Sequence, residues 1–225
     1  MAARSLKGRY TSRMEQSEHR RLTLDEYLAL EAVSPDRLEY RDGFAVALAV
    51  PAKNHARIAG NLAMSLGPLI RGQGCDFFAG DAKVLTPNGD RAIPDFVVTC
   101  DPRDRDANHD RGEALVRHPR LVIEILSPAT ATDDTTDKLD AYQSIPELTH
   151  YVVIDSRRRA IRLYERMSDG SFATRGPLAK LMLPNITDRE ISIQERLPRY
   201  DRPRVPGHPQ RTLNSVALCP PFTPR

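Results

Sequence analysis

The chain has 225 residues, 40% of them hydrophobic, and a formal net charge of +3. This length and apolar content suit one domain of ordinary size with tails, or at most two small domains, and we prefer the first interpretation. No apolar run approaches the roughly 18 residues that a membrane helix needs, and no apolar stretch follows the basic N-terminus. We therefore expect neither a membrane protein nor a secreted one, but a soluble, cytoplasmic protein.

The cysteines give no sign of a disulfide framework or a metal site. Cys75, Cys100 and Cys219 are odd in number and lack Cys-x-x-Cys spacing. This pattern argues against both a disulfide scaffold and a zinc site, so we expect reduced thiols.

Charge is divided unevenly along the chain. Residues 1–22 carry a net charge of +4 and residues 196–225 one of +5, whereas residues 23–195 carry −6. Basic flanks suit a nucleic-acid partner because Lys and Arg attract phosphates; the alternative is that both flanks are merely solvated. The last segment also holds seven prolines, which oppose helix and central strand. We predict a basic N-terminal tail over 1–22, one domain over 23–195 and a disordered C-terminal tail over 196–225.

The first predicted elements are a short helix and a β-hairpin. Thr23 precedes an apolar face that recurs up to Leu30, which predicts a capped helix that stops before Pro35. The pair Asp42-Gly43 then separates two apolar runs, and Asp-Gly in that context is a strong hairpin signal.

The remaining elements predict a mixed domain. Residues 54–70 have apolar residues at helical spacing, and a second helix over 134–144 places Lys138 and Tyr142 on one face. The charged stretch 101–114 lacks periodicity and is predicted to be a mobile surface loop. Strands are predicted at 75–79, 82–85, 95–99, 121–126, 150–154 and 160–164. This series predicts an α/β domain in which a central mixed β-sheet is flanked by helices.

Two carboxylates lie in apolar segments that are predicted to be strands. Glu124 has three aliphatic residues before it and two after it, so its charge requires a partner. We expect that partner to be Mg²⁺, which prefers oxygen ligands, shared with Asp95, which Pro94 holds near the start of its strand. The alternatives are a buried salt bridge from Glu124 to an arginine and a simple turn role for Asp95. Phosphodiester hydrolysis is the chemistry that such an ion suits.

Three more residues are candidates for the same site. The amine of Lys138 could stabilise hydroxide or the charge that develops on phosphorus, although a solvated helix lysine is the plainer interpretation. Glu39, just before the hairpin, could bind the same ion or a second one, or could pair with Arg37 or Arg41. His55 lies near a helix start, where N–H groups and nearby cations could receive a phosphate; a lone histidine there is more often structural.

Several short motifs occur in a characteristic order. They are Leu38-Glu39-Tyr40 with Asp42-Gly43, His55 opening a long helix, Pro94-Asp95, Glu124-Ile125-Leu126-Ser127-Pro128, Lys138 with Tyr142, and His150-Tyr151-Val152-Val153-Ile154-Asp155. Over roughly residues 23–195 this order resembles the Uma-type family of putative restriction endonucleases, in the PD-(D/E)XK nuclease superfamily.

The resemblance implies a fold and a set of roles. The fold is a restriction-endonuclease-like core with an N-terminal helix and β-hairpin. Asp95 and Glu124 look like the metal-binding acids, Lys138 like the catalytic lysine, and Glu39 like the acid from the N-terminal region. The superfamily pattern acid-x-Lys is broken here, because position 126 is Leu. Lys138 on the neighbouring helix is expected to take the lysine's role.

Our first hypothesis is an endonuclease that cuts DNA with Mg²⁺, or with Mn²⁺ as a substitute. Asp95, Glu124 and the Ile125 carbonyl would hold the ion, and Lys138 would orient a water. The resemblance also implies a homodimer, because many nucleases on this scaffold pair so that two sites address two strands.

Two other hypotheses stay open. The missing acid-x-Lys lysine and the acidic middle favour an inactive nuclease-fold module that binds DNA. A third hypothesis is a metal-free hydrolase in which the two carboxylates act as acid and base. A serine hydrolase is excluded because no Gly-x-Ser-x-Gly occurs.

Overall fold

The computed structural model describes residues 20–105, 114–126, 134–157, 160–178, 180–183 and 186–192. All of these belong to the compact unit Met1–Glu195. The predicted tails lie outside the described residues, apart from residues 20–22, and so does most of the charged stretch 101–114. The described start of that stretch contains a short 3-10 helix, η1 (Pro102–Asp104), rather than irregular loop alone.

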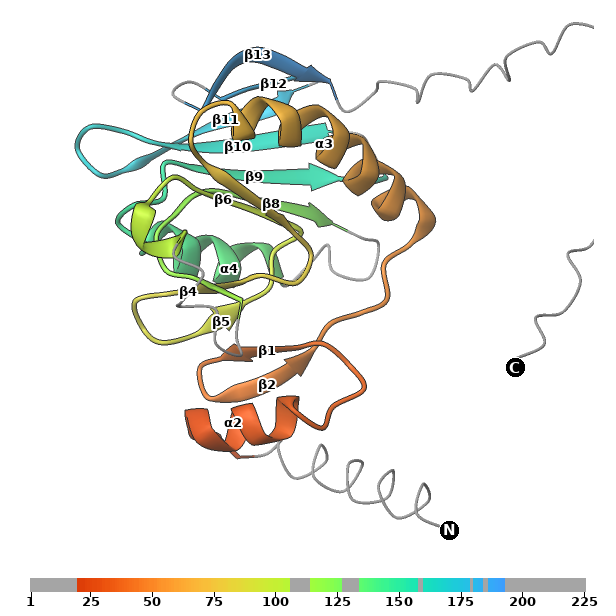
Figure 1. The fold of residues 1–225 in the computed structure, drawn as a ribbon, viewed down its shortest axis with the longest axis vertical. Helices are drawn as coiled ribbons and strands as arrows, with labels where there is room; N and C mark the ends of the chain where they lie inside the picture. Colours follow the sequence, from red (N-terminus) through yellow and green to blue (C-terminus); the bar gives the residue numbers. More distant parts are fainter. Residues whose placement is uncertain are drawn as a thin grey trace, which may run out of the picture. The chain divides into compact units, whose positions relative to one another are not determined.

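A six-stranded mixed sheet forms the centre of the unit (Figure 1), in the order β11-β10-β9-β8-β6-β3. Its strands are β3 (Asp76–Ala79), β6 (Phe96–Thr99), β8 (Pro119–Leu126), β9 (His150–Asp155), β10 (Ala160–Arg166) and β11 (Phe172–Leu178). The pair β8–β9 is parallel and the others are antiparallel. The predicted central mixed sheet is therefore confirmed.

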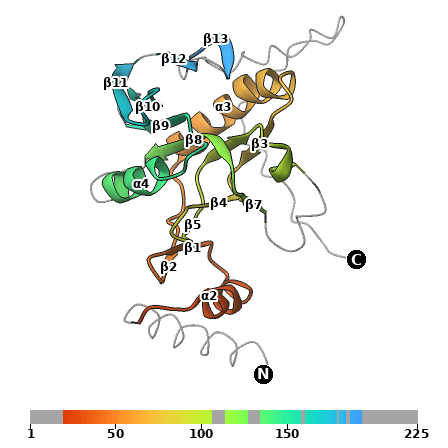
Figure 2. The same cartoon turned by 90° about the vertical axis from the view of Figure 1, so that its left-hand side faces the viewer.

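Helices cover both faces of this sheet (Figure 2). The long helix α3 (Lys53–Arg71) packs its apolar stripe, which includes Leu62 and Leu66, on one face. The helix α4 (Asp134–Gln143) joins the parallel strands and packs Tyr142 against the other face. Because both faces are covered, β8 and β9 are apolar almost throughout, as buried parallel strands usually are.

A second, five-stranded sheet was not predicted as a separate layer. Its order is β2-β1-β5-β4-β7, and its strands are β1 (Leu38–Arg41), β2 (Phe44–Ala47), β4 (Lys83–Leu85), β5 (Arg91–Ala92) and β7 (Leu115–Val116). The strands β5 and β7 have two residues each, too few for a periodicity to register in the sequence. This sheet carries the predicted Asp42-Gly43 hairpin, in which both turn residues have positive φ.

The N-terminal helix α2 (Leu24–Glu31) is fixed by its cap and by the second sheet. The side chain of Thr23 accepts a hydrogen bond from the backbone N–H of Glu26, and the carboxylate of Glu26 accepts one from the backbone N–H of Thr23. This capping box starts the helix. Tyr27 and Leu30 pack with Leu38 in a small core of their own. The Tyr27 hydroxyl also donates to the Leu38 carbonyl at 2.8 Å. The predicted helix and its cap are confirmed.

A last hairpin, β12 (Lys180–Leu183) with β13 (Thr187–Ser192), was not predicted. Leu181 and Leu183 alternate with exposed residues and join the core under α3. The alternating segment is short and is followed at once by Pro184, so its period of two was not recognised in the sequence.

Cys75 and Cys100 form a disulfide, so the prediction that all three cysteines are reduced is wrong for this pair. The two residues flank β3 and β6, and the register Asp76↔Thr99 continues to place Cys75 opposite Cys100. Sequence spacing alone does not reveal such a pair, because only strand pairing brings the residues together.

Removing this disulfide should destabilise the fold. The link spans 25 residues, and closing a loop of that size in the unfolded chain gives about 3 kcal/mol. We expect Cys75→Ser to lower the free energy of unfolding in urea by that amount. Equal stability of Cys75→Ser and the parent under oxidising conditions would contradict the structural role.

Candidate active site

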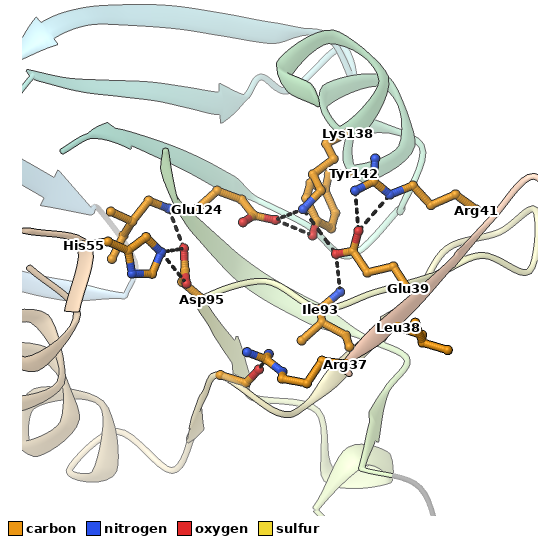
Figure 3. A network of polar contacts seen from close by, with 12 residues as sticks. Arg37, Leu38, Glu39, Arg41, His55, Ile93, Asp95, Glu124, Lys138 and Tyr142 are labelled. Carbon is orange, nitrogen blue, oxygen red and sulfur yellow. Dashed lines mark hydrogen bonds and ion pairs between the residues drawn. The ribbon is translucent and has the colours of Figure 1, made fainter. Parts of the chain in front are cut away.

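The predicted site residues gather around one pocket of about 100 Å³, which has room for a cation and several waters. The pocket lies where β6 and β8 meet the start of α3 and the face of α4, as Figure 3 shows from close by. Its lining includes His55, Asp95, Glu124, Ile125 and Lys138. Leu126, which stands where the superfamily pattern has lysine, lines the same pocket.

Strand pairing brings the two predicted acids together. The strands β6 and β8 are antiparallel, with Phe96 opposite Ile123. The next step of this register sets Asp95 opposite Glu124, and residues opposed in this way are close neighbours. The expected convergence of Asp95 and Glu124, 29 positions apart in the sequence, follows from this register.

Asp95 is held by two donors. The backbone N–H of Ile125 donates to its Oδ2 at 2.6 Å, and Nε2 of His55 lies 3.0 Å from Oδ1 and 3.1 Å from Oδ2. This hydrogen bond to Asp95 raises the pKa of His55 above its usual value, with burial acting against the shift. The contact of His55 with Asp95 was not predicted from the sequence, and its phosphate contact stays a prediction. Helical periodicity says nothing about which strand end the histidine meets.

Glu124 is held by two side chains of α4. Lys138 Nζ lies 3.1 Å from Glu124 Oε1, and the Tyr142 hydroxyl donates to the same oxygen at 2.9 Å. The alternative of a salt bridge from Glu124 is therefore realised, with a lysine in place of an arginine. The i, i+4 spacing of Lys138 and Tyr142 was visible in the sequence, but the shared target was not.

Glu39 is completely buried and does not line the pocket. Its Oε1 accepts from the Ile93 backbone at 2.8 Å and from Lys138 Nζ at 3.2 Å. Its Oε2 accepts from Nε of Arg41 at 2.7 Å and from a second nitrogen of the same guanidinium. With both oxygens engaged, this geometry favours the ion-pair alternative for Glu39 over the predicted metal ligation.

Carboxylates and cations both line the pocket: Asp95 and Glu124 lie there together with Arg37 and Lys138. Burial raises the pKa of Glu124 to about 7; the Lys138 ammonium acts against this shift, while the charges of Asp95 and Glu39 add to it. Burial, reinforced by the Glu124 charge, also raises the pKa of Tyr142 well above its usual value, so its hydroxyl stays a donor.

The donor set limits how a metal would be held. Within the described ranges, no three His, Cys, Asp or Glu side chains gather closely enough to hold one ion. Glu39, Asp95 and Glu124 therefore do not form a three-carboxylate group. Asp95 and Glu124 as a pair still fit Mg²⁺, which commonly takes one or two carboxylates and completes its shell with water and substrate phosphate.

Comparison with known proteins identifies the family. The sequence profile of Uma2, described as "Putative restriction endonuclease", matches residues 24–194. The chain belongs to this family. The predicted resemblance is confirmed, and residues 23–195 of the prediction correspond closely to the matched range.

The Uma2 relatives include two proteins of Synechocystis sp. The uncharacterized protein slr1290 is 33% identical over 153 residues, covering 68% of this chain and 78% of the relative. The uncharacterized protein sll1609 is 27% identical over 149 residues, covering 66% and 82%. A crystal structure of a putative nuclease belonging to DUF820 from Anabaena variabilis is 21% identical, with a TM-score of 0.60, covering 76% of this chain and 95% of that one. This likeness confirms the predicted fold class.

The sequence predicts no membrane-spanning helix. Among the described residues, no helix is both long and apolar enough to cross a bilayer.

Proposed function

We propose that this Uma2 protein is a divalent-metal-dependent endonuclease that hydrolyses phosphodiester bonds of DNA. The observation that carries the proposal is the meeting of Asp95 and Glu124 in one pocket, with the Lys138 ammonium bonded to Glu124. Membership of a family described as restriction endonucleases supports the choice of substrate.

The residues have distinct roles in this proposal. Asp95 and Glu124 would hold Mg²⁺ or Mn²⁺, with the Ile125 carbonyl as a further ligand. When bound, such an ion polarises a phosphoryl oxygen and lowers the pKa of a coordinated water. Lys138 lies on the wall of the same pocket. Its ammonium can donate a hydrogen bond to the attacking water, and its positive charge stabilises the negative charge that develops on the phosphate.

The start of α3 supplies a place for the substrate phosphate. Its N-cap residue, Ala52, makes no side-chain cap, and its first turn has no acidic residue, so its N–H groups and positive helix end are available to an anion. His55 in this turn lines the pocket beside Asp95. We propose that His55 contacts the substrate phosphate. We also propose that two copies of the chain pair, so that two sites cut two strands.

Plasmid cleavage tests the proposed function. We expect supercoiled DNA to be nicked or linearised with Mg²⁺ or Mn²⁺ and to stay intact with a chelator. Asp95→Asn should lower the rate at least about 100-fold, because a neutral amide is a poor ligand for a hard cation. The control is Asp140→Asn, an exposed aspartate of α4, which should cut like the parent. Cleavage by Asp95→Asn at the parent's rate would contradict the assignment of Asp95 as a metal ligand.

One observation favours the second candidate, an inactive module that binds DNA. Lys138 already bonds both Glu39 and Glu124, so its ammonium partly neutralises the carboxylates without an ion. Calorimetry that finds no Mn²⁺ binding, together with DNA binding that weakens steeply with salt, would favour this candidate over an enzyme.

A further inference from the structure

We infer that Glu39 is a positioning residue for Lys138, so that the N-terminal unit formed by α2, β1 and β2 determines where the active-site amine lies. The inference rests on the proposed function for its catalytic meaning. It assigns Glu39 a part that acts through Lys138 rather than on the metal or the substrate.

Burial and hydrogen bonds hold the Glu39 side chain in one position. It has no exposed surface, and donors from three different residues fix its carboxylate: Ile93, Lys138 and Arg41. The Ile93 bond comes from the backbone, which cannot swing away as a side chain can. Arg41 places two nitrogens on the second oxygen, and hydrogen bonds between charged groups are stronger than those between neutral ones.

Lys138, by contrast, has a flexible four-carbon stem. Its amine reaches Glu124 Oε1 at 3.1 Å and Glu39 Oε1 at 3.2 Å, so two carboxylates on opposite sides of the amine fix its position (Figure 3). Lys138 and Glu124 line the pocket, whereas Glu39 lies behind them. Without Glu39 the amine keeps its bond to Glu124 but loses the fixed carboxylate on its other side.

The unit that carries Glu39 is itself anchored to the rest of the fold. Tyr40 of β1 pairs with Arg91 of β5, which directly precedes the segment that donates from Ile93. The second sheet therefore fixes the position of Glu39, and Glu39 in turn fixes that of the Lys138 amine.

The test compares two variants of the same unit. Glu39→Gln keeps the size of the side chain and an acceptor for Ile93, but removes the charge that holds Lys138. Glu31→Gln removes a charge from a different ion pair of the unit, the one with Lys83 of β4, without touching Lys138 and is the matched control. We expect Glu39→Gln to lower kcat at least tenfold, with KM and the Kd for Mn²⁺ within twofold of the parent. Glu31→Gln should keep kcat within twofold.

The competing outcomes are distinct. A tenfold weaker Kd for Mn²⁺ in Glu39→Gln would make Glu39 a metal ligand and overturn the inference. An equal loss of kcat in Glu31→Gln would overturn it as well, because loosening of the unit would then be the cause. In a Lys138→Met background, Glu39→Gln should have no further effect on kcat; a full, additive loss would show that Glu39 acts independently of the lysine.

A measurement without catalysis separates this inference from the proposed function. The rate at which an acylating reagent labels Lys138, followed by mass spectrometry, should rise several-fold in Glu39→Gln and stay unchanged in Glu31→Gln. If the parent cuts no DNA, the proposed function fails while this rate still decides whether Glu39 holds the amine. An unchanged rate in Glu39→Gln overturns the inference. Should that variant not fold, Glu39→Asp serves, since it keeps the charge beside Arg41 but withdraws from Lys138.

Discussion

Glu124→Gln is expected to abolish DNA cleavage and yet to leave the metal-free protein more stable than the parent at pH 8. Loss of a metal-binding carboxylate should lower the rate by at least about 100-fold. The gain in stability arises because burial raises the pKa of Glu124 to about 7. The site keeps an ionised carboxylate at pH 8 at the expense of stability, and glutamine removes that charge while keeping an acceptor for Lys138 and Tyr142.

The pH dependence of this variant has a definite sign. The folded protein holds the Glu124 proton more tightly than the unfolded chain, whose glutamate has an ordinary pKa near 4.5. The stabilisation from that proton is fully present below pH 4.5 and is lost as the pH rises through about 7. Between pH 5 and pH 8 the parent should therefore lose about 2.5 kcal/mol relative to Glu124→Gln.

Urea unfolding in the presence of a chelator, repeated across this pH range, measures the effect. Glu147→Gln, at an exposed position after α4, is the control and should follow the parent at every pH. Parallel curves for the parent and Glu124→Gln would show that Glu124 titrates normally. In the same range, metal-dependent cleavage by the parent should fall as the pH drops below about 7, because a proton then competes with the cation.

Lys138→Met should have the opposite effect on stability. The amine bonds two buried carboxylates, and removing it leaves Glu39 and Glu124 without their shared cation. Breaking a buried ion pair on one side costs about 3–5 kcal/mol, so we expect a loss of this size in the free energy of unfolding at pH 8. Cleavage should also fall about 100-fold or more but stay measurable, because the positive charge beside the reacting phosphate is gone.

Two further measurements separate this explanation from simple loss of packing. The double variant Glu124→Gln with Lys138→Met should recover part of the stability lost in Lys138→Met, since the uncompensated charge of Glu124 is removed while Glu39 keeps Arg41. Saturating Mn²⁺ should raise the midpoint of thermal unfolding more in Lys138→Met than in the parent, because the ion replaces the missing positive charge. Lys180→Met, an exposed lysine of β12, is the control. No recovery in the double variant would contradict the charge explanation.

Local patterns in the sequence determined much of the fold. The capping box at Thr23, the Asp42-Gly43 turn and the apolar stripe of α3 are each encoded by neighbouring residues, and the structure contains all three. The apolar surroundings of Glu124 also indicated correctly that its charge is buried with a partner. These features need no long-range contact to be recognised, because turn geometry, helix capping and burial act on short stretches of chain.

Only the tertiary structure decided which groups meet. The registers of β3, β6 and β8 place Asp95 opposite Glu124 and close the Cys75–Cys100 disulfide, and strand register depends on the whole sheet. The partner of Glu39 was left open between a metal and an arginine because its neighbours in sequence say nothing about Lys138, 99 positions away. A residue's type sets what it can bind, whereas packing of distant segments sets what it does bind.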